Sequence, residues 1–253
     1  QQLARLTRVR TPRHLLLGPF SLHKQMLRHI EQVAEAARAG APARSVLKLN
    51  ALTDIPLIEA LILASQAGAS IDLVVRGACM LPPGVPGHTE RIRVRSVVGR
   101  FLEHTRLLYF RWGKADEQEV LYLSSADWMS RNMFRRIEVA WPVRDVALRQ
   151  RLIDECLVPY LQDRCDAWIQ QSDGRYERVG HDGPSAQQAL RARSAQACPR
   201  GSDGPDPLAP CRRGGRAGSG RPRTASPGCG RHRRGRPRRR ARRQAHRAPI
   251  ASC

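Results

Sequence analysis

An almost unbroken apolar stretch at 71–75 constrains the fold of this chain more than any other feature. A strand with so few polar residues is expected where helices cover both faces of a parallel β-sheet. The residues before it fit this arrangement, because their periodicity predicts a strand at 45–50 and an amphipathic helix from about 54 to 67. Strand–helix–strand repetition of this kind implies right-handed crossovers and an α/β fold.

Hydrophobic periodicity also predicts the other elements. We expect strands at 14–20, 91–98, 107–110, 120–124 and 137–143, and helices at 21–40 and 145–170. The segment between the third and fourth predicted strands is rich in proline and glycine, which is typical of an irregular loop. Trp128, Trp141 and Trp168 are interpreted as core anchors, with Trp168 on the apolar stripe of the last helix.

The composition changes abruptly near residue 180. Residues 181–253 hold 18 of the 44 Lys and Arg residues against three Asp, so most of the net charge of +22 belongs to this segment. The segment is rich in Arg, Gly, Pro, Ala and Ser and contains no aromatic residue, so it cannot bury enough apolar surface to offset chain entropy. We therefore expect a disordered tail at 181–253, which would bind nucleic acid only non-specifically, through counterion release.

The cysteines and the termini indicate the class of protein. Seven cysteines stand at spacings that match no metal motif, so no metal site is predicted and a reduced, cytoplasmic protein is the default. Neither a signal peptide nor an apolar run of about 18 residues is found, so neither secretion nor a membrane span is expected. Because the chain begins with Gln1, we interpret residues 1–14 as a lead-in from a missing upstream domain.

Arg76 is the first candidate for a binding role. It directly follows the apolar strand and directly precedes Gly77, so its guanidinium would project at the carboxyl edge of the sheet, where α/β proteins gather ligands. That position suits a phosphate. For this residue alone, a solvated arginine at the end of a strand remains the simpler interpretation, because most arginines are exposed.

His104 and Arg106 are the second candidate. They stand two residues apart and would project to the same side of an extended segment. A histidine beside an arginine suits a phosphoryl acceptor or an acid–base group on a phosphate oxygen, although a lone histidine is more often structural. The Ser-Ser-Ala-Asp turn at 124–127 would either close on its own backbone or orient a catalytic group.

Arg136 and Glu138 are the third candidate, two residues apart on a predicted strand. On a shared face they would form a plain ion pair or a phosphate clamp that the carboxylate positions. Lys48 and Asn50 end another strand in a similar way.

In their order along the chain, these residues resemble the carboxyl-terminal catalytic portion of bacterial polyphosphate kinases. The similarity extends from about Leu15 to Val179. The motifs are KLN at 48–50, IDLVVRG at 71–77, IRVR at 92–95, FLEHTR at 101–106, YLSSADWM at 122–129, RN at 131–132 and RIEV at 136–139. Several ordered motifs at family-like spacing are far more specific than a single signature.

The resemblance implies a fold and a reaction. The expected fold is a phospholipase-D-like mixed β-sheet flanked by helices at 15–180, the second of two homologous halves that face each other, each with one histidine. The implied reaction is reversible transfer of the ATP terminal phosphoryl group to polyphosphate, through a phosphohistidine on the missing half and with Mg²⁺ beside ATP or ADP. It implies catalytic roles for His104, Arg106 and Glu138, and nucleotide binding by Arg76, His104 and Arg136.

One residue departs from the phospholipase D pattern. Arg106 replaces the lysine of the phospholipase D His-x-Lys pattern, as it does in polyphosphate kinases, which favours a kinase over a phosphodiesterase.

The fragment alone is expected to be inactive, and the intact enzyme to be a homo-oligomer. The alternatives are polyanion or nucleic-acid binding through the basic tail, and a phospholipase-D-like phosphodiesterase that acts as a homodimer. One hypothesis for the tail itself is a frame-shifted read of GC-rich DNA.

Overall fold

The computed structural model describes residues 15–180 and 182–197. The strands are β1 (Leu16–Gly18), β2 (Arg44–Leu49), β3 (Ser70–Val75), β4 (Ile92–Val97), β5 (Leu107–Arg111), β6 (Glu119–Ser124), β7 (Glu138–Pro142), β8 (Ala167–Gln170) and β9 (Tyr176–Arg178). The helices are α1 (Leu22–Arg38), α2 (Ile55–Gln66), α3 (Ser130–Arg135), α4 (Val146–Cys156), α5 (Val158–Gln162) and α6 (Ala186–Ala197). Within the described residues the strands form one sheet in the order β1-β7-β6-β5-β2-β3-β4-β8-β9.

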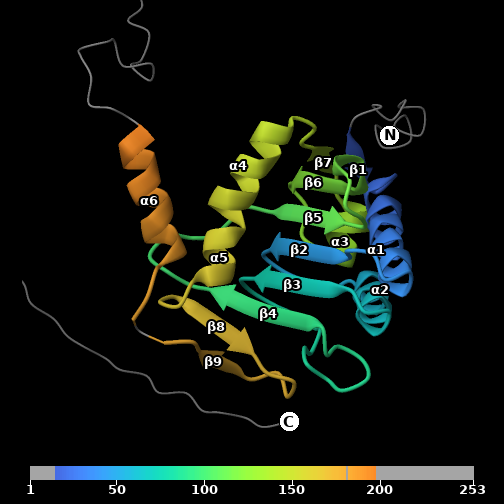
Figure 1. Ribbon diagram of the computed structural model, residues 1–253, viewed down its shortest axis with the longest axis horizontal. Helices are drawn as coiled ribbons and strands as arrows, with labels where there is room; N and C mark the ends of the chain where they lie inside the picture. Colours follow the sequence, from blue (N-terminus) through green and yellow to red (C-terminus); the bar gives the residue numbers. More distant parts are fainter. Residues whose placement is uncertain (1–14, 181, 198–253) are drawn as a thin grey trace, which may run out of the picture. The chain divides into compact units, whose positions relative to one another are not determined.

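The expected mixed sheet flanked by helices is confirmed (Figure 1). Strands β2, β3 and β4 run parallel, whereas β5 pairs with β2 in the antiparallel direction. Helices α1 and α2 lie on one side of the sheet, and α4 and α5 lie on the other. Strand β3 is apolar almost throughout because both of its faces are covered: Leu73 packs in the α1–α2 core and Val74 packs near Tyr160 of α5.

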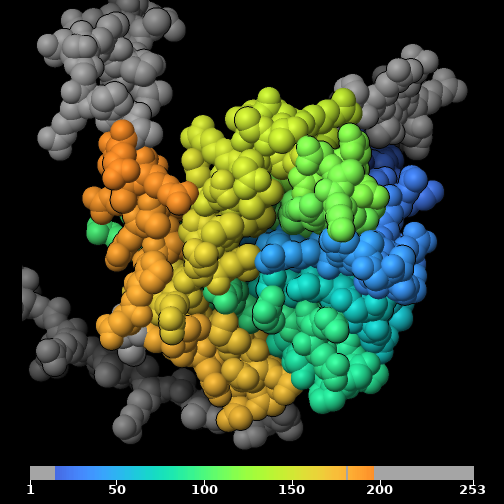
Figure 2. Space-filling model, viewed as in Figure 1, coloured from blue at the N-terminus to red at the C-terminus, as the bar shows by residue number. Residues whose placement is uncertain are grey.

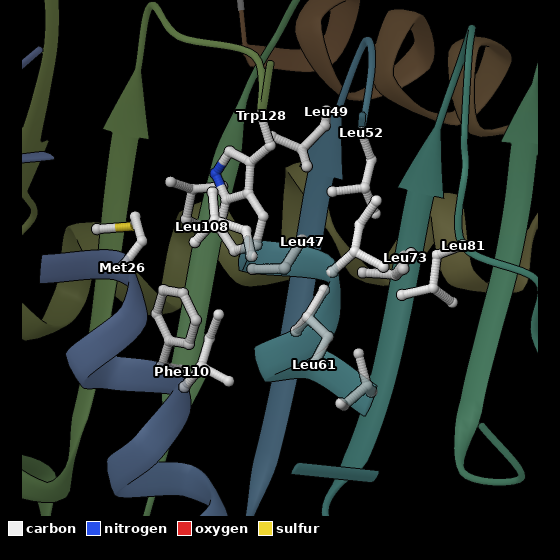
Figure 3. Close-up of a cluster of buried hydrophobic side chains, with 14 of the residues drawn as sticks. Met26, Leu47, Leu49, Leu52, Leu61, Leu73, Leu81, Leu108, Phe110 and Trp128 are labelled. Atoms are coloured by element: carbon white, nitrogen blue, oxygen red, sulfur yellow. The ribbon is translucent and has the colours of Figure 1, made fainter. Parts of the chain in front are cut away.

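The main hydrophobic core lies between the sheet and the α1–α2 pair (Figure 3). Trp128 is fully buried there, beside Leu49 and Leu108. Its backbone also ties two loops together, since its carbonyl oxygen accepts from the Thr53 and Asp54 amides at 2.8 and 2.9 Å. Burial of a large apolar side chain contributes about 1.5–3 kcal/mol. Trp128 is thus an anchor as expected, and it fixes the end of the segment that follows β6.

The single helix expected at 145–170 is wrong. The chain forms α4, breaks at Leu157, forms the one-turn helix α5 with Pro159 in its first turn, and then forms strand β8. Proline lacks the N–H that would continue α4, and β8 pairs with β4 along an edge that would otherwise stay open. Trp141 and Trp168 are not core anchors, because 42% and 37% of their surface is exposed.

Helical structure is found past residue 180, where we expected the disordered tail to begin. Helix α6 occupies 186–197, and the side chain of Gln187 at its start is buried. Local composition could not reveal this, because polar contacts dock the helix: the Asp163 carboxylate accepts from the Ala186 amide at 2.7 Å. The remainder of the expected tail, residues 198–253, and the expected lead-in at 1–14 lie outside the described residues. No described helix is long and apolar enough to cross a membrane.

Candidate functional site

Polar residues gather at one edge of the sheet because of its topology. The carboxyl ends of the parallel strands β2 and β3 meet there, and antiparallel pairing brings the start of β5, the end of β6 and the start of β7 to the same edge. The structure therefore brings together Arg76, the segment 101–106, the turn 124–127 and Glu138. Direct contacts link these groups in a chain across the edge.

Arg106 is bound by Asp127. Its Nε and Nη2 donate to the two carboxylate oxygens at 3.1 and 3.0 Å, and both side chains are largely buried. Burial alone would raise the pKa of Asp127, but the hydrogen bonds from Arg106 and from the backbone amides of Asn50 and Ala51, with the Arg106 charge, lower it below its usual value. Asp127 thus stays ionised and balances the charge of Arg106.

His104 is exposed and is held by the free end of Arg106. The Arg106 Nη1 atom lies 3.3 Å from His104 Nδ1 and donates to the His104 carbonyl oxygen at 3.2 Å. A guanidinium can only donate, so Nδ1 must act as the acceptor. In the neutral ring the proton then lies on Nε2, which is free to act as an acid–base group on a bound phosphate.

Arg76 is half-buried and has no balancing carboxylate. Its Nη1 donates to the Glu103 carbonyl oxygen at 2.7 Å. No carboxylate of the described ranges 15–180 and 182–197 lies within ion-pairing distance of Arg76. A Cβ at Gly77 would stand 2.9 Å from the Asn50 carbonyl oxygen, so this position requires glycine. Arg76 thus keeps an uncompensated charge close to the backbone of Glu103, the residue before His104, which suits an anionic ligand.

Glu138 does not pair with Arg136. Helix α3 ends at Arg135 and strand β7 begins only at Glu138, so exposed Arg136 lies outside the strand that was expected to hold both residues. Buried Glu138 instead accepts from Asn132 Nδ2 at 2.7 Å and from the Ser125 hydroxyl. Asn132 was not predicted as a site residue, because its pairing with a carboxylate six residues later depends on where the helix ends.

The turn at 124–127 closes on its own backbone and also binds neighbouring polar side chains. The Ser124 hydroxyl closes the turn by accepting from the Ala126 amide at 3.0 Å. Ser125 and Asp127 point to other groups, since they bind Glu138 and Arg106. The turn thus connects the Arg106 side of the candidate site to the Glu138 side.

A buried cluster lies directly beneath this edge. Lys48 is 3% exposed, and its Nζ donates to the Glu103 carboxylate at 2.7 Å and lies 4.0 Å from the centre of the Tyr160 ring. Asn50 links Glu103 to Arg106. With its amide nitrogen turned toward Glu103, Asn50 donates to the Glu103 backbone carbonyl oxygen at 2.9 Å, and its amide oxygen accepts from Arg106 at 2.9 Å. A small pocket lined by Lys48, Arg76 and Tyr160, among others, opens here. No sequence signal identified Tyr160.

The chain is similar to several known proteins. The family model described as polyphosphate kinase C-terminal domain 2 matches residues 15–190. The polyphosphate kinase of Burkholderia ambifaria strain MC40-6 is 52% identical over 178 residues, which cover 70% of this chain and 26% of that protein. The Burkholderia multivorans polyphosphate kinase is 54% identical over 161 residues, covering 64% and 23%. The chain therefore spans about a quarter of the length of these curated relatives.

A solved structure agrees with these relatives. The crystal structure of polyphosphate kinase from Porphyromonas gingivalis superimposes with a TM-score of 0.68 and 35% identity. The match covers 77% of this chain and 31% of that protein.

Proposed function

The chain belongs to the polyphosphate kinase C-terminal domain 2 family, and on that premise we propose that it forms one wall of the active site of an ATP:polyphosphate phosphotransferase. In this proposal the intact enzyme transfers the terminal phosphoryl group of ATP reversibly to polyphosphate, through a phosphohistidine outside this chain. The chain alone would lack the nucleophile and would be inactive.

One observation supports the proposal most strongly. Arg76 donates to the backbone of Glu103, the residue before His104, and no described carboxylate neutralises its charge, while Arg106 and Asp127 hold the histidine ring in a defined orientation. Phosphoryl transfer depends mainly on positioning and on cations that stabilise negative charge on phosphate oxygens. We assign Arg76 and exposed Arg136 to the nucleotide phosphates.

The other site residues take complementary roles in this proposal. His104 exchanges a proton with a phosphate oxygen through Nε2 while Arg106 keeps Nδ1 as an acceptor. Glu138 holds Asn132 and Ser125, and so maintains the shape of the wall beside Arg136.

The substrates in this proposal are ATP or ADP and polyphosphate, with Mg²⁺ accompanying the nucleotide. The described residues do not form a magnesium site of their own: the carboxylates of Asp127 and Glu138 are already hydrogen-bonded, and no described group of three or more His, Cys, Asp or Glu side chains could hold a metal ion. We also propose that the intact enzyme is a homo-oligomer in the cytoplasm, as the family suggests.

A chimeric enzyme tests the proposal. Residues 15–197 of this chain would replace the matching segment of the Burkholderia ambifaria polyphosphate kinase, and polyphosphate synthesis from ATP would be measured. Substitution of His104 by Asn or Arg76 by Ala should lower kcat/KM by about 100-fold or more. The control is Arg38→Ala, since Arg38 is an exposed residue at the end of α1. Unchanged synthesis in both site variants would refute the assignment.

A further inference from the structure

Glu103, directly before His104, is a meeting point of distant segments. Its carboxylate accepts from Lys48 of β2 at 2.7 Å, from the Tyr160 hydroxyl of α5 at 2.9 Å and from Gln187 of α6 at 2.7 Å. Its carbonyl oxygen accepts from Arg76 at 2.7 Å. One residue thus joins the histidine segment to the arginine that we assign to phosphate.

Gln187 also forms hydrogen bonds with the backbone of this segment. Its Oε1 accepts from the Phe101 amide at 2.9 Å, and its Nε2 donates to the Phe101 carbonyl oxygen at 2.8 Å. The Gln187 side chain is buried, and a Cβ at Gly99 would stand 2.6 Å from its Oε1. Both polar atoms of the Gln187 amide therefore have hydrogen-bond partners. Position 99, two residues before Phe101, leaves room for this amide only when it is glycine.

Apolar packing does not hold the histidine segment in place. Phe101 and Leu102 are 54% and 78% exposed, and residues 102–106 adopt neither helix nor strand. In Figure 1 this green segment passes beside the orange helix α6, and in Figure 2 α6 lies next to the yellow α4–α5 region. Hydrogen bonds therefore fix its position: those of Glu103 and Gln187 at its start, and those of Arg106 to Asp127 at its end.

The charge of Glu103 fits a positional role. Burial alone would raise the pKa of Glu103, but the hydrogen bond and charge of Lys48, with the hydrogen bonds of Gln187 and Tyr160, lower it. The carboxylate therefore stays ionised at neutral pH. Buried ion pairs often add little net stability, because desolvation cancels the attraction, but they do specify geometry when every acceptor is satisfied.

We propose that Glu103 and Gln187 are positioning residues for the phosphoryl transfer, a clamp that fixes the His104 segment and the Arg76 guanidinium relative to each other. This inference rests on the proposed function and extends the site to α6. Displacement of a catalytic group by about 1 Å can cost about 100-fold in rate. Loss of the clamp should therefore lower kcat far more than it raises KM for ATP.

Two neighbouring glutamines offer a matched comparison. Gln187→Met keeps the side-chain volume and removes the hydrogen bonds, whereas Gln188→Met changes the next residue, whose side chain is exposed. In the chimeric enzyme, Gln187→Met should lower kcat by about 10- to 100-fold with KM for ATP within about threefold, and Gln188→Met should be neutral. Equal effects of both substitutions, or a rise in KM alone, would contradict the clamp.

Measurements on the full 253-residue chain separate the clamp from the proposed function. Gln187→Met should change the NMR signal of the His104 ring and accelerate amide exchange at Phe101, while the signal of buried His29 stays in place. Gly99→Ala, whose Cβ pushes Gln187 away, should do the same if Gln187→Met fails to fold. Unchanged His104 signals and exchange would overturn the clamp. If the His104 signals change but the chimeric enzyme keeps full activity without His104, the clamp would be supported and the proposed kinase site refuted.

Discussion

The Arg106 guanidinium binds both carboxylate oxygens of Asp127 and directs its remaining amino group to the His104 ring. The positive charge in contact with the histidine is therefore neutralised by a carboxylate, whereas no carboxylate of the described residues neutralises the charge of Arg76. This difference separates an orienting arginine from a ligand-binding one.

Arg106→Lys should keep the charge and lose the orientation. A lysine ammonium cannot bind both Asp127 oxygens in a planar pair and also reach His104. We expect a loss of about 10- to 100-fold in kcat of the chimeric enzyme, with a cost of about 1–3 kcal/mol in the free energy of unfolding. Steady-state kinetics and urea denaturation measure the two effects. Wild-type kcat in Arg106→Lys would show that the paired geometry is not required.

Asp127→Asn should alter the acid dependence of stability. The folded-state pKa of Asp127 lies below its usual value, so its ionisation stabilises the fold above about pH 4, the ordinary pKa of aspartate, and this contribution is lost as pH falls through the folded-state pKa. Asp127→Asn removes that contribution and leaves Arg106 unpaired, which we expect to cost about 3–5 kcal/mol at neutral pH. Urea denaturation over a series of pH values should show the two proteins converge toward acid; a constant difference would argue against this account.

Glu138→Ala and Arg136→Ala should separate stability from binding. Glu138→Ala leaves the Asn132 amide and the Ser125 hydroxyl without their acceptor, and we expect a cost of about 2–4 kcal/mol in unfolding free energy. Arg136 is exposed, so Arg136→Ala should change stability by less than about 0.5 kcal/mol but weaken ATP binding. Denaturation of the chain and calorimetric titration of the chimeric enzyme with ATP measure these outcomes. If Glu138→Ala weakened ATP binding without loss of stability, and Arg136→Ala destabilised the fold without weakening binding, both proposed roles would be wrong.

Trp128→Ala and Trp141→Ala should differ strongly. Trp128 is fully buried, and its replacement should cost about 3–5 kcal/mol through lost burial and a cavity. Trp141 is 42% exposed, so we expect its replacement to cost less than about half of that. Comparable losses in thermal or urea unfolding would mean that Trp141 is packed more tightly than its exposure indicates.

Periodicity predicted most elements because local residues decide them. Strands β2 to β6 and helices α1 and α2 lie where the apolar pattern placed them. The pattern failed at 167–170, where the residues continue an apolar stripe but form strand β8, because β4 offers backbone partners that no local window contains. The Arg136–Glu138 pair failed for a similar reason, since β7 begins only at Glu138 and the Glu138 carboxylate is bound by Asn132 and Ser125.

The amino-acid sequence by itself determined the α/β class, the family, and the placement of Arg76, His104 and Arg106 at strand ends, because these follow from residue order and hydrophobic period. Tertiary structure alone decided which charges are neutralised and what holds the histidine. Asp127, Lys48 and Gln187 reach the segment 101–106 from distant parts of the chain. Hydrogen bonds depend on distances of about 3 Å between side chains, and only the folded backbone sets those distances.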